Sequence, residues 1–180
     1  MKLKKLSKEL FKEKKVKKPI KYEEFIKRIL KEDKELYVPF DEAPPVSIST
    51  NYSISENERD SLIVTLQISN RSEEPVAVVG GYLGQKEPFT KIEEIYGLET
   101  KTYGDYTAIS CMDIPAKETR EIRYKMKVLK KPSEDYLFTI SLHIAFLDEK
   151  DKLKIFLKSA GSMKMGYLLD AYDITPSSEA

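Results

Sequence analysis

A run of aliphatic residues at every second position, from Leu62 to Ile68, constrains the fold of this chain more than any other feature. A period of two is typical of a β-strand that buries one of its faces. Residues 70–75 are polar and end in proline, which favours a turn, and residues 76–83 form a second apolar run. The region therefore predicts two antiparallel strands joined by a polar turn.

Later segments repeat this order of strand, turn and strand. The predicted strands are residues 46–54, 62–69, 76–83, 106–112, 122–128, 138–146 and 153–157. Residues 163–167 either extend the last strand or begin another. Residues 84–104 lack a clear period and predict a long connection, with a short strand at residues 90–95 as the alternative. About seven strands without a helix among them predict an all-β fold, an immunoglobulin-like antiparallel β-sandwich with an N-terminal α-helical extension.

Two short motifs of the chain resemble those of bacterial and archaeal immunoglobulin-like modules. One strand ends in Asn70 followed by small polar residues and Pro75, and a later strand is introduced by Ile-Pro-Ala at residues 114–116. The resemblance implies a fold and no particular activity. The chain departs from antibody domains because it has no tryptophan and only one cysteine, so it lacks their Cys–Trp–Cys core.

The N-terminal residues 1–37 predict a basic amphipathic helical extension. Residues 1–18 contain nine lysines and two glutamates, and they carry an apolar stripe made of Leu3, Leu6, Leu10 and Phe11. Residues 22–32 predict a better helix, because their apolar side chains recur three and four positions apart. This second stripe either packs on the protein's own sandwich or docks into a groove of another protein.

Prolines mark the boundary between the extension and the body. Pro39, Pro44 and Pro45 lie within residues 38–45, which predict an extended Pro-rich linker. The sandwich is predicted to occupy residues 46–169. Residues 170–180 lose periodicity and end in small polar residues, which predicts a mobile tail.

Charge is unevenly distributed along the chain. Residues 1–36 hold 14 Lys/Arg and 7 Asp/Glu, a net +7, and since the whole chain is +1 the remainder carries −6. This asymmetry indicates a basic arm. Abundant Lys, Glu and Ile with few side-chain amides resemble the composition of proteins from hot environments.

The sequence also predicts a cytoplasmic location. A single cysteine excludes an intramolecular disulfide, which favours a reducing compartment. The chain has no run of about 18 apolar residues, the length that a membrane span requires. The basic residues at the start of the chain are not followed by the apolar core of a signal peptide.

No residue pattern matches a catalytic motif. His143 is the only histidine, and we expect it to be an ordinary surface or packed strand residue. Cys111 has no second thiol or second imidazole to activate it, and we expect it to be a buried strand residue. Gly80 and Gly81 are not followed by the residues of a phosphate loop, so they indicate a bulge or a close approach of two backbones. We therefore predict that the protein is not an enzyme and has no catalytic residues.

Metal and cofactor sites are not predicted either. A zinc site of the usual kind needs four nitrogen or sulfur ligands, and one histidine with one cysteine provides two. Asp148, Glu149 and Asp151 could offer oxygen ligands to a hard cation, but they lack the spacing of a calcium loop. Turn formation explains these acidic residues better.

Two groups of residues are candidates for binding. Tyrosine suits recognition because it provides contact area at low entropic cost, so the aromatic residues of segment 84–106 predict a protein-binding surface. These candidates are Phe89, Tyr96, Tyr103 and Tyr106. The second group is an anion-binding arm, consisting of Lys4, Lys5, Lys8, Lys12, Lys14, Lys15, Lys17 and Lys18.

The leading functional hypothesis is a protein-interaction module. In this interpretation the sandwich is a rigid body, and the N-terminal helix or the 84–106 loops contact a protein partner. The alternatives are association with nucleic acid through the Lys-rich arm, or attachment of the same arm to an anionic membrane surface. Phe11 is the only aromatic residue in residues 1–18, which makes base stacking weak.

Overall fold

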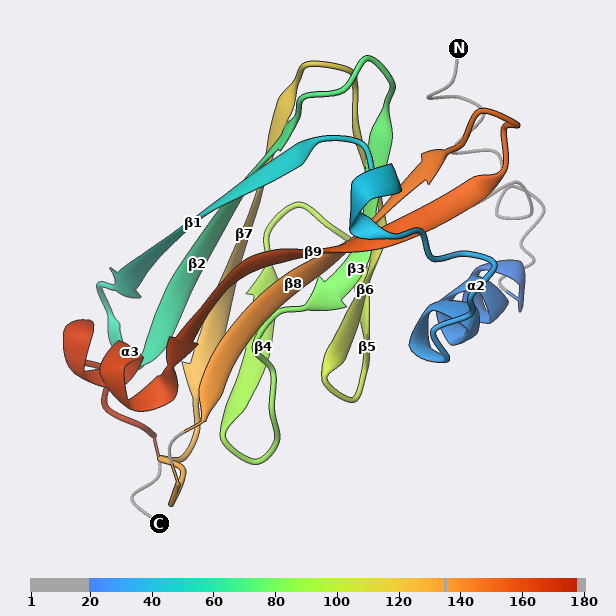
Figure 1. Cartoon of the computed structure of the whole chain (residues 1–180). Coiled ribbons are helices and arrows are strands. Elements are labelled where there is room, and N and C mark those ends of the chain that lie inside the picture. Colours follow the sequence, from blue (N-terminus) through green and yellow to red (C-terminus); the bar gives the residue numbers. More distant parts are fainter. Residues whose placement is uncertain (1–19, 135, 178–180) are drawn as a thin grey trace.

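The body of the protein is a sandwich of two antiparallel β-sheets, described by a computed structural model that covers residues 20–134 and 136–177 (Figure 1). The strands in this part of the chain are β1 (Val46–Ser55), β2 (Glu58–Asn70), β3 (Val76–Tyr82), β4 (Thr90–Ile95), β5 (Thr100–Tyr103), β6 (Tyr106–Ile114), β7 (Thr119–Val128), β8 (Leu137–Leu147) and β9 (Leu153–Lys164). The helices are α2 (Ile20–Leu30), the 3-10 helix η2 (Phe40–Glu42) and α3 (Met165–Ala171). The predicted antiparallel β-sandwich is confirmed.

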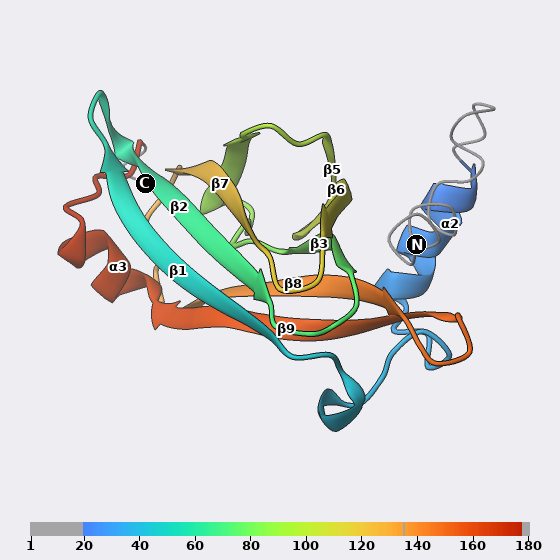
Figure 2. The same cartoon turned by 90° about the horizontal axis from the view of Figure 1, so that it is seen from above.

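The order of the strands is related to that of the immunoglobulin fold. One sheet has the order β1-β2-β7-β4 and the other the order β5-β6-β3-β8-β9. The first corresponds to the A-B-E-D sheet of immunoglobulin domains, and β3-β8-β9 corresponds to C-F-G. Strand β4 crosses to the first sheet before the β5–β6 hairpin extends the second. Seen from above, the two sheets form separate layers, and α2 lies outside the five-stranded sheet (Figure 2).

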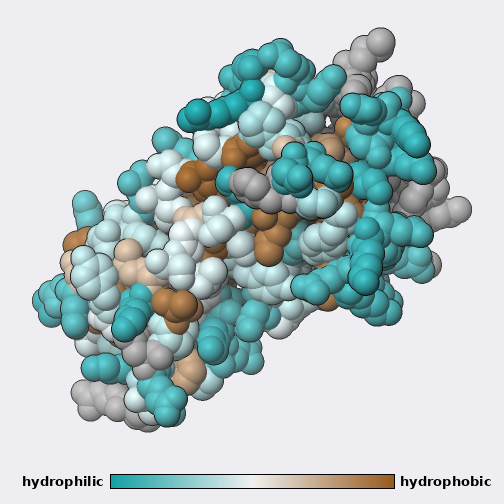
Figure 3. Space-filling view, viewed as in Figure 1, coloured by the Kyte–Doolittle hydropathy of each residue, from teal (hydrophilic) through white to brown (hydrophobic). Residues whose placement is uncertain are grey.

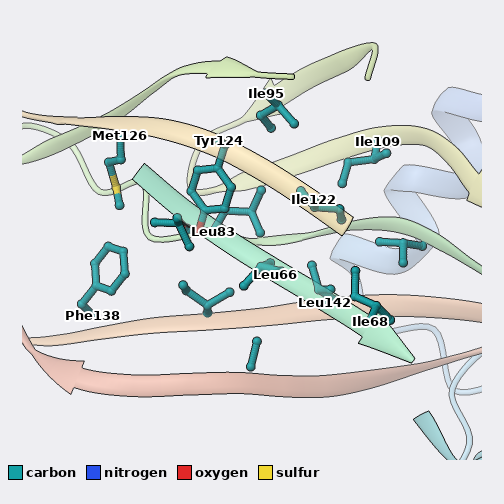
Figure 4. Packing of buried hydrophobic residues seen from close by; sticks show 14 of the residues in the cluster. Leu66, Ile68, Leu83, Ile95, Ile109, Ile122, Tyr124, Met126, Phe138 and Leu142 are labelled. Carbon is teal, nitrogen blue, oxygen red and sulfur yellow. Dashed lines mark hydrogen bonds between the residues drawn. The ribbon is translucent and has the colours of Figure 1, made fainter. Parts of the chain in front are cut away.

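The alternating side chains of β2, β7 and β8 meet in the main core between the sheets. Leu66 on β2, Ile122 on β7 and Leu142 on β8 are fully buried and point into this layer (Figure 4). Tyr124 is also buried, and its hydroxyl donates a hydrogen bond of 2.9 Å to the carbonyl of Leu83. Burial raises the pKa of Tyr124 well above its usual value, so the phenol stays neutral in the core.

Asn70 connects two turns at one end of the sandwich. Its side chain is 1% exposed, and its Nδ2 lies 2.8 Å from the Glu74 carbonyl, 3.1 Å from the Ile114 carbonyl and 3.2 Å from the Pro115 carbonyl. Its Oδ1 accepts the N–H of Ser72 at 3.0 Å. A buried amide with all these partners stabilises a turn strongly. The two motifs that resemble immunoglobulin-like modules are therefore joined by one side chain.

The region 84–104 is more ordered than a long connection. The alternative short strand at residues 90–95 is confirmed as β4, and β5 was missed. Strand β5 has four residues at the edge of its sheet and pairs only with β6, so little of it is buried. A short edge strand leaves almost no alternation in the sequence.

The C-terminal part of the chain differs from the expectation. Residues 165–167 begin helix α3 instead of continuing a strand. Within the predicted tail, Ile174 is 8% exposed and belongs to the main core, and the N–H of Thr175 donates to the Arg59 carbonyl at 2.9 Å. Residues 170–177 are therefore attached to the sandwich, and residues 178–180 lie outside the described part.

The N-terminal extension is described only from residue 20 onward. This part contains α2, while residues 1–19, with the predicted lysine arm, lie outside the described residues, so a helical extension over residues 1–37 stays a prediction. The predicted linker follows the edge of β9, where Tyr37 forms a parallel bridge with Ile155, and then forms η2. No helix in the described residues is long and apolar enough to cross a membrane.

Candidate binding surface

Helix α2 packs on the outer face of the five-stranded sheet. Phe25, Ile26 and Ile29 are buried in a second apolar cluster, separate from the main core. The sheet contributes mostly small or branched side chains to this cluster: Ala77, Val79, Ala108, Ala145 and Ile155. The alanines permit a close approach of the helix to the sheet. The apolar stripe of α2 is therefore used inside this chain.

A tight reversal ends α2 and returns the chain to the sheet. The N–H of Glu32 donates to the Ile29 carbonyl and the N–H of Asp33 to the Arg28 carbonyl, both at 3.0 Å, and Glu32 has φ 54°. This is the Schellman pattern of helix termination. Asp33 accepts Arg28 Nε at 2.7 Å and the Glu35 N–H at 3.0 Å, and these two hydrogen bonds lower the pKa of its carboxyl.

The segment after the reversal binds the edge of β9. The N–H of Ile155 donates to the Leu36 carbonyl at 2.8 Å, and the N–H of Val38 donates to the Ile155 carbonyl at 3.1 Å. Leu36 itself is 2% exposed. These contacts hold α2 at both ends, because Glu23 near its start pairs with Lys101 of β5 at 3.3 Å.

His143 connects β8 to the end of α2 through Tyr37. The Tyr37 hydroxyl lies 3.0 Å from the Ile29 carbonyl and 2.7 Å from His143 Nε2. Since the hydroxyl has one proton and donates it to the carbonyl, Nε2 carries hydrogen and donates to Tyr37. Nδ1, which then has no hydrogen, finds no hydrogen-bond partner within residues 20–134 and 136–177. His143 is thus a neutral packed residue, as expected.

Burial controls the titration of this pair. His143 is 2% exposed, and desolvation lowers its pKa to about 4. Desolvation also raises the pKa of Tyr37 to about 12, with smaller contributions from Tyr82 and Glu32. The rings of Tyr37, Tyr82 and Tyr106 lie 5.6, 6.1 and 5.4 Å from the imidazole. No carboxylate forms a hydrogen bond with His143 in the described chain.

Beside α2 the same sheet face has an open area without charged side chains. We call this area the strip, and it consists of Tyr82, Thr139, Ser141, Leu157, Ser159 and Ser162. Register places them together, because Tyr82 is opposite Ser141 and Ser141 is opposite Ser159. Tyr82 is 37% exposed and Leu157 is 47% exposed. The strip contains no charged side chain in a protein of which 34% is charged.

Glycine permits the close packing beneath the strip. A Cβ on Gly80 would lie 2.3 Å from the Tyr106 hydroxyl, and a Cβ on Gly81 would lie 2.3 Å from the Ser141 carbonyl. The pairing of β3 with β8 also shifts between Val78 and Gly80. The prediction of a bulge and a close backbone approach at these glycines is confirmed.

The aromatic residues predicted as one binding surface lie in three places. Tyr106 is 1% exposed under α2, with the half-buried Tyr103 opposite it on β5. Phe89 packs against Tyr136 at a ring distance of 5.8 Å. Tyr96 is 43% exposed on the other sheet. The fold does not bring these four residues together, whereas Tyr82 reaches the strip.

The cationic outer side of β7 is occupied by ion pairs. Lys125 bonds Glu58, which lowers the pKa of that carboxyl, and Lys127 lies 3.7 Å from Asp60. Arg123, on the same side of β7, lies over the ring of Tyr96 at 5.8 Å. These cations are already matched by acidic or aromatic groups, so they do not form a free row for phosphate.

The face seen in Figure 3 is divided into regions of different hydropathy. Weakly polar and hydrophobic atoms occupy its middle, where β9 and β1 run, and hydrophilic atoms gather toward its ends (Figure 3). The outer side of β1 and of residues 61–69 of β2 is also uncharged, but its side chains are mostly Ser, Thr, Asn and Gln. The strip differs because it adds an exposed tyrosine and an exposed leucine.

Metal binding finds no support in the described residues. They contain no cluster of three His, Cys, Asp or Glu side chains that could hold an ion. Asp148 instead accepts the N–H groups of Lys150 and Lys152, both at 2.9 Å, and these bonds lower the pKa of its carboxyl. This agrees with the turn-forming role expected for the hairpin. Cys111 lies in β6.

An open groove of about 860 Å³ lies at the end of the sandwich near this hairpin. Its lining includes Pro75 and Phe146, and it mixes acidic residues such as Glu42 and Glu149 with lysines such as Lys150. A lining of mixed charge selects no particular ligand class.

The chain matches no protein-family model and no curated protein. Among solved structures, it is similar to a GH20 exo-β-N-acetylglucosaminidase from Vibrio harveyi, with TM-score 0.41, 12% identity, and coverage of 73% of this chain and 18% of that one. The major pilin subunit BcpA of Bacillus cereus gives TM-score 0.44 and 11% identity, covering 67% of this chain and 40% of the pilin. The ASH/PapD-like domain of human CEP192 gives TM-score 0.31 and 10% identity, covering 70% of this chain and 93% of that domain.

These similarities are weak. The chain spans less than half of the Vibrio and Bacillus proteins, and identity is between 10% and 12% in all three cases. They assign neither a family nor an activity to this chain.

Proposed function

We propose that this chain is a non-enzymatic protein-interaction module that binds a protein partner through the strip. The observation that carries the proposal is an exposed tyrosine and an exposed leucine on an uncharged part of a sheet, beside a docked helix. The centres of protein interfaces are depleted in charge and enriched in aromatic residues. Ser and Thr hydroxyls around them supply hydrogen bonds without the cost of desolvating a charge.

The strip replaces the two surfaces proposed from the sequence. The apolar side of α2 is buried against its own sheet, and the aromatic residues of segment 84–106 are dispersed. The strip also has a rigid base, because it lies on paired strands over the main core. A rigid surface loses little conformational entropy on binding.

Affinity capture from a lysate of the source organism tests this proposal. The variant Leu157→Glu places a charge in the strip, where a partner would have to desolvate it. The matched control is Ile54→Glu, which changes another exposed aliphatic residue, 57% exposed on β1. We expect a protein that the wild type and Ile54→Glu retain and Leu157→Glu loses. Equal recovery by the two variants would contradict the proposal.

The basic arm supports two further hypotheses that stay predictions, since it lies outside the described residues. Nucleic-acid binding through these lysines requires that affinity for duplex DNA falls as salt rises. Attachment to a membrane surface requires sedimentation with anionic but not with neutral liposomes. Neither requires the strip, so Leu157→Glu should leave both unchanged.

A further inference from the structure

Helix α2 and the strip lie on the same sheet face, and α2 shows what kind of element that face accepts (Figure 2). The sheet offers α2 three alanines, Ala77, Ala108 and Ala145, and the helix buries Phe25 and Ile29 against them. We propose that the strip receives an amphipathic α-helix of the protein partner, which lies beside α2. This inference rests on the proposed function and names the structural class of the partner segment.

The strip continues the surface that α2 covers. Four of its six side chains are short and uncharged: Thr139, Ser141, Ser159 and Ser162. Leu157 lies two residues beyond the buried Ile155 on β9, and the ring of Tyr82 lies 5.3 Å from the ring of Tyr106 in the α2 cluster. Short side chains let a helix approach closely, while Leu157 and Tyr82 provide apolar area to bury. A second helix would therefore extend a contact that the fold already makes.

The dimensions of this surface suit one helix. Phe138 is buried in the main core, so Leu137 points to the outer face like the strip, and it is 61% exposed. His143 is opposite Leu157, and positions 143 and 137 of β8 are six residues apart, about 20 Å. A helix covers that length with about 13 residues. The width from β3 to β9 is two strand spacings, about 10 Å, which is the diameter of a helix.

Pairing of an extended partner segment with the edge of β9 is hindered, because this edge is already used. The N–H of Ile155 donates to the Leu36 carbonyl at 2.8 Å, and its carbonyl accepts the N–H of Val38 at 3.1 Å. The carbonyl of Ala160 accepts the hydroxyl of Thr50 on β1. Addition of a strand requires a free row of N–H and C=O groups along such an edge.

An extended segment could instead lie flat on the strip, but its backbone would then lose its hydrogen bonds. Its N–H and C=O groups would be buried against side chains, and each group without a partner costs free energy. A helix satisfies these groups internally and presents only side chains to the sheet. The strip therefore favours a helix over an extended peptide.

Charges at the two ends of the strip define the charges of the partner helix. Burial raises the pKa of Tyr82, and the nearby carboxylates of Glu32 and Asp105 raise it further. At the other end, the exposed Lys164 is opposite Leu137. Complementary charges give a helix with an uncharged centre, basic side chains near Tyr82 and acidic side chains near Leu137.

Selection from two displayed peptide libraries, with the full chain as bait, tests the inference. The first library has a helical background of Ala, Glu and Lys, about 14 residues long, with randomised positions three and four apart. The matched library randomises as many positions in a background with proline at every third residue, which prevents a helix. The dissociation constants of selected peptides are then measured for the wild type and for variants.

We expect binding peptides from the helical library alone. Leu157→Glu and Leu137→Glu should each weaken their binding by about tenfold or more, because a charge is buried without a partner. Ile54→Glu changes an aliphatic residue that is 57% exposed on β1, and it should leave the affinity within about twofold.

Photo-crosslinking then measures the conformation of the bound peptide. The photo-reactive amino acid p-benzoylphenylalanine replaces Leu157 in one variant and Leu137 in another, and mass spectrometry identifies the linked peptide residues. A helix should give links about 13 residues apart, with the basic end linked to position 157, whereas an extended peptide should give links about 6 residues apart.

Four results would overturn the inference. These are selection of proline-containing peptides, affinity that does not depend on Leu157 and Leu137, links at the extended spacing or with the charges reversed, and no binding peptide from either library. A dimer of the full chain that Leu157→Glu dissociates in sedimentation would also overturn it, because the strip would then bind a second copy.

Affinity capture with Leu157→Glu separates this inference from the proposed function. A captured protein that depends on Leu157, without binding peptides from the helical library, would refute the inference alone. Helical peptides that bind the strip, without any captured protein that depends on Leu157, would refute the proposed function alone.

Discussion

Lowering the pH should destabilise this protein through His143 in a window that lies mostly above the ordinary pKa values of the carboxyl groups. His143 is the only histidine. Its pKa is lowered by burial from 6.5 to about 4, so the unfolded chain binds a proton more tightly than the native protein between these values. Stability linked to this group is complete above pH 6.5 and is lost as the pH falls toward 4.

The magnitude follows from the two pKa values. Between about pH 7.5 and about pH 5 the linkage relation gives a loss of about 2 kcal/mol in the free energy of unfolding. The same relation gives only about 0.8 kcal/mol at about pH 6, so the loss should be concentrated near the acidic end of the window.

Carboxyl groups act mainly at lower pH. Asp33, Glu58 and Asp148 have pKa values lowered below 3.8, 4.5 and 3.8 by their hydrogen bonds. Their contributions to stability are present above the pKa of the unfolded chain and are lost as the pH falls through the lower native values. They therefore overlap little with the histidine window.

Urea denaturation as a function of pH measures the effect, with His143→Gln as the control. Glutamine retains an N–H donor for the Tyr37 hydroxyl and does not titrate, so its stability should be nearly flat between about pH 7.5 and about pH 5. A histidine proton resonance in the native wild type should show no titration near pH 6.5. The reasoning is wrong if the free energy of unfolding depends on pH equally in the wild type and in His143→Gln, or if the pKa of His143 in the native protein is near 6.5.

Three further predictions concern stability. Phe25→Ala should lower the free energy of unfolding by about 3 kcal/mol, because Phe25 is 7% exposed on the side of α2 that faces the sheet. Lys27→Ala, on the exposed side of α2, should change it by no more than about 0.5 kcal/mol. Equal urea midpoints for the two variants would contradict the docking of α2. Gly84→Ala should lower the melting temperature more than Gly97→Ala does. Both glycines have positive φ, 93° and 74°, but a Cβ at position 84 would lie 2.2 Å from the buried ring of Phe138, whereas a Cβ at position 97 would meet nothing within 4 Å. Glu32→Gly should stabilise the protein by about 1 kcal/mol in chemical denaturation, because a φ of 54° is strained for a residue with a side chain. A loss of stability in this variant would contradict the strain.

The alternation of apolar residues was sufficient to predict most strands and the sandwich. It succeeded for β2, β7 and β8 because each of these strands buries one face in the main core. It failed where a strand buries little, as in β5. It also failed at α3, where Met163, Met165 and Tyr167 alternate by chance; the signal available there was the helical spacing of Met165, Leu168 and Leu169, which are all buried.

The candidate surface required the tertiary structure. Tyr82 and Leu157 are distant in the sequence, and they share a face only because the register places Tyr82 opposite Ser141 and His143 opposite Leu157. The Tyr37–His143 hydrogen bond joins residues 106 positions apart. Local sequence determines which side chains of a strand share a face, because that depends on backbone geometry alone. Packing over the whole chain determines which strands become neighbours and which part of a sheet face α2 leaves open. A local pattern in the sequence does not predict either of these.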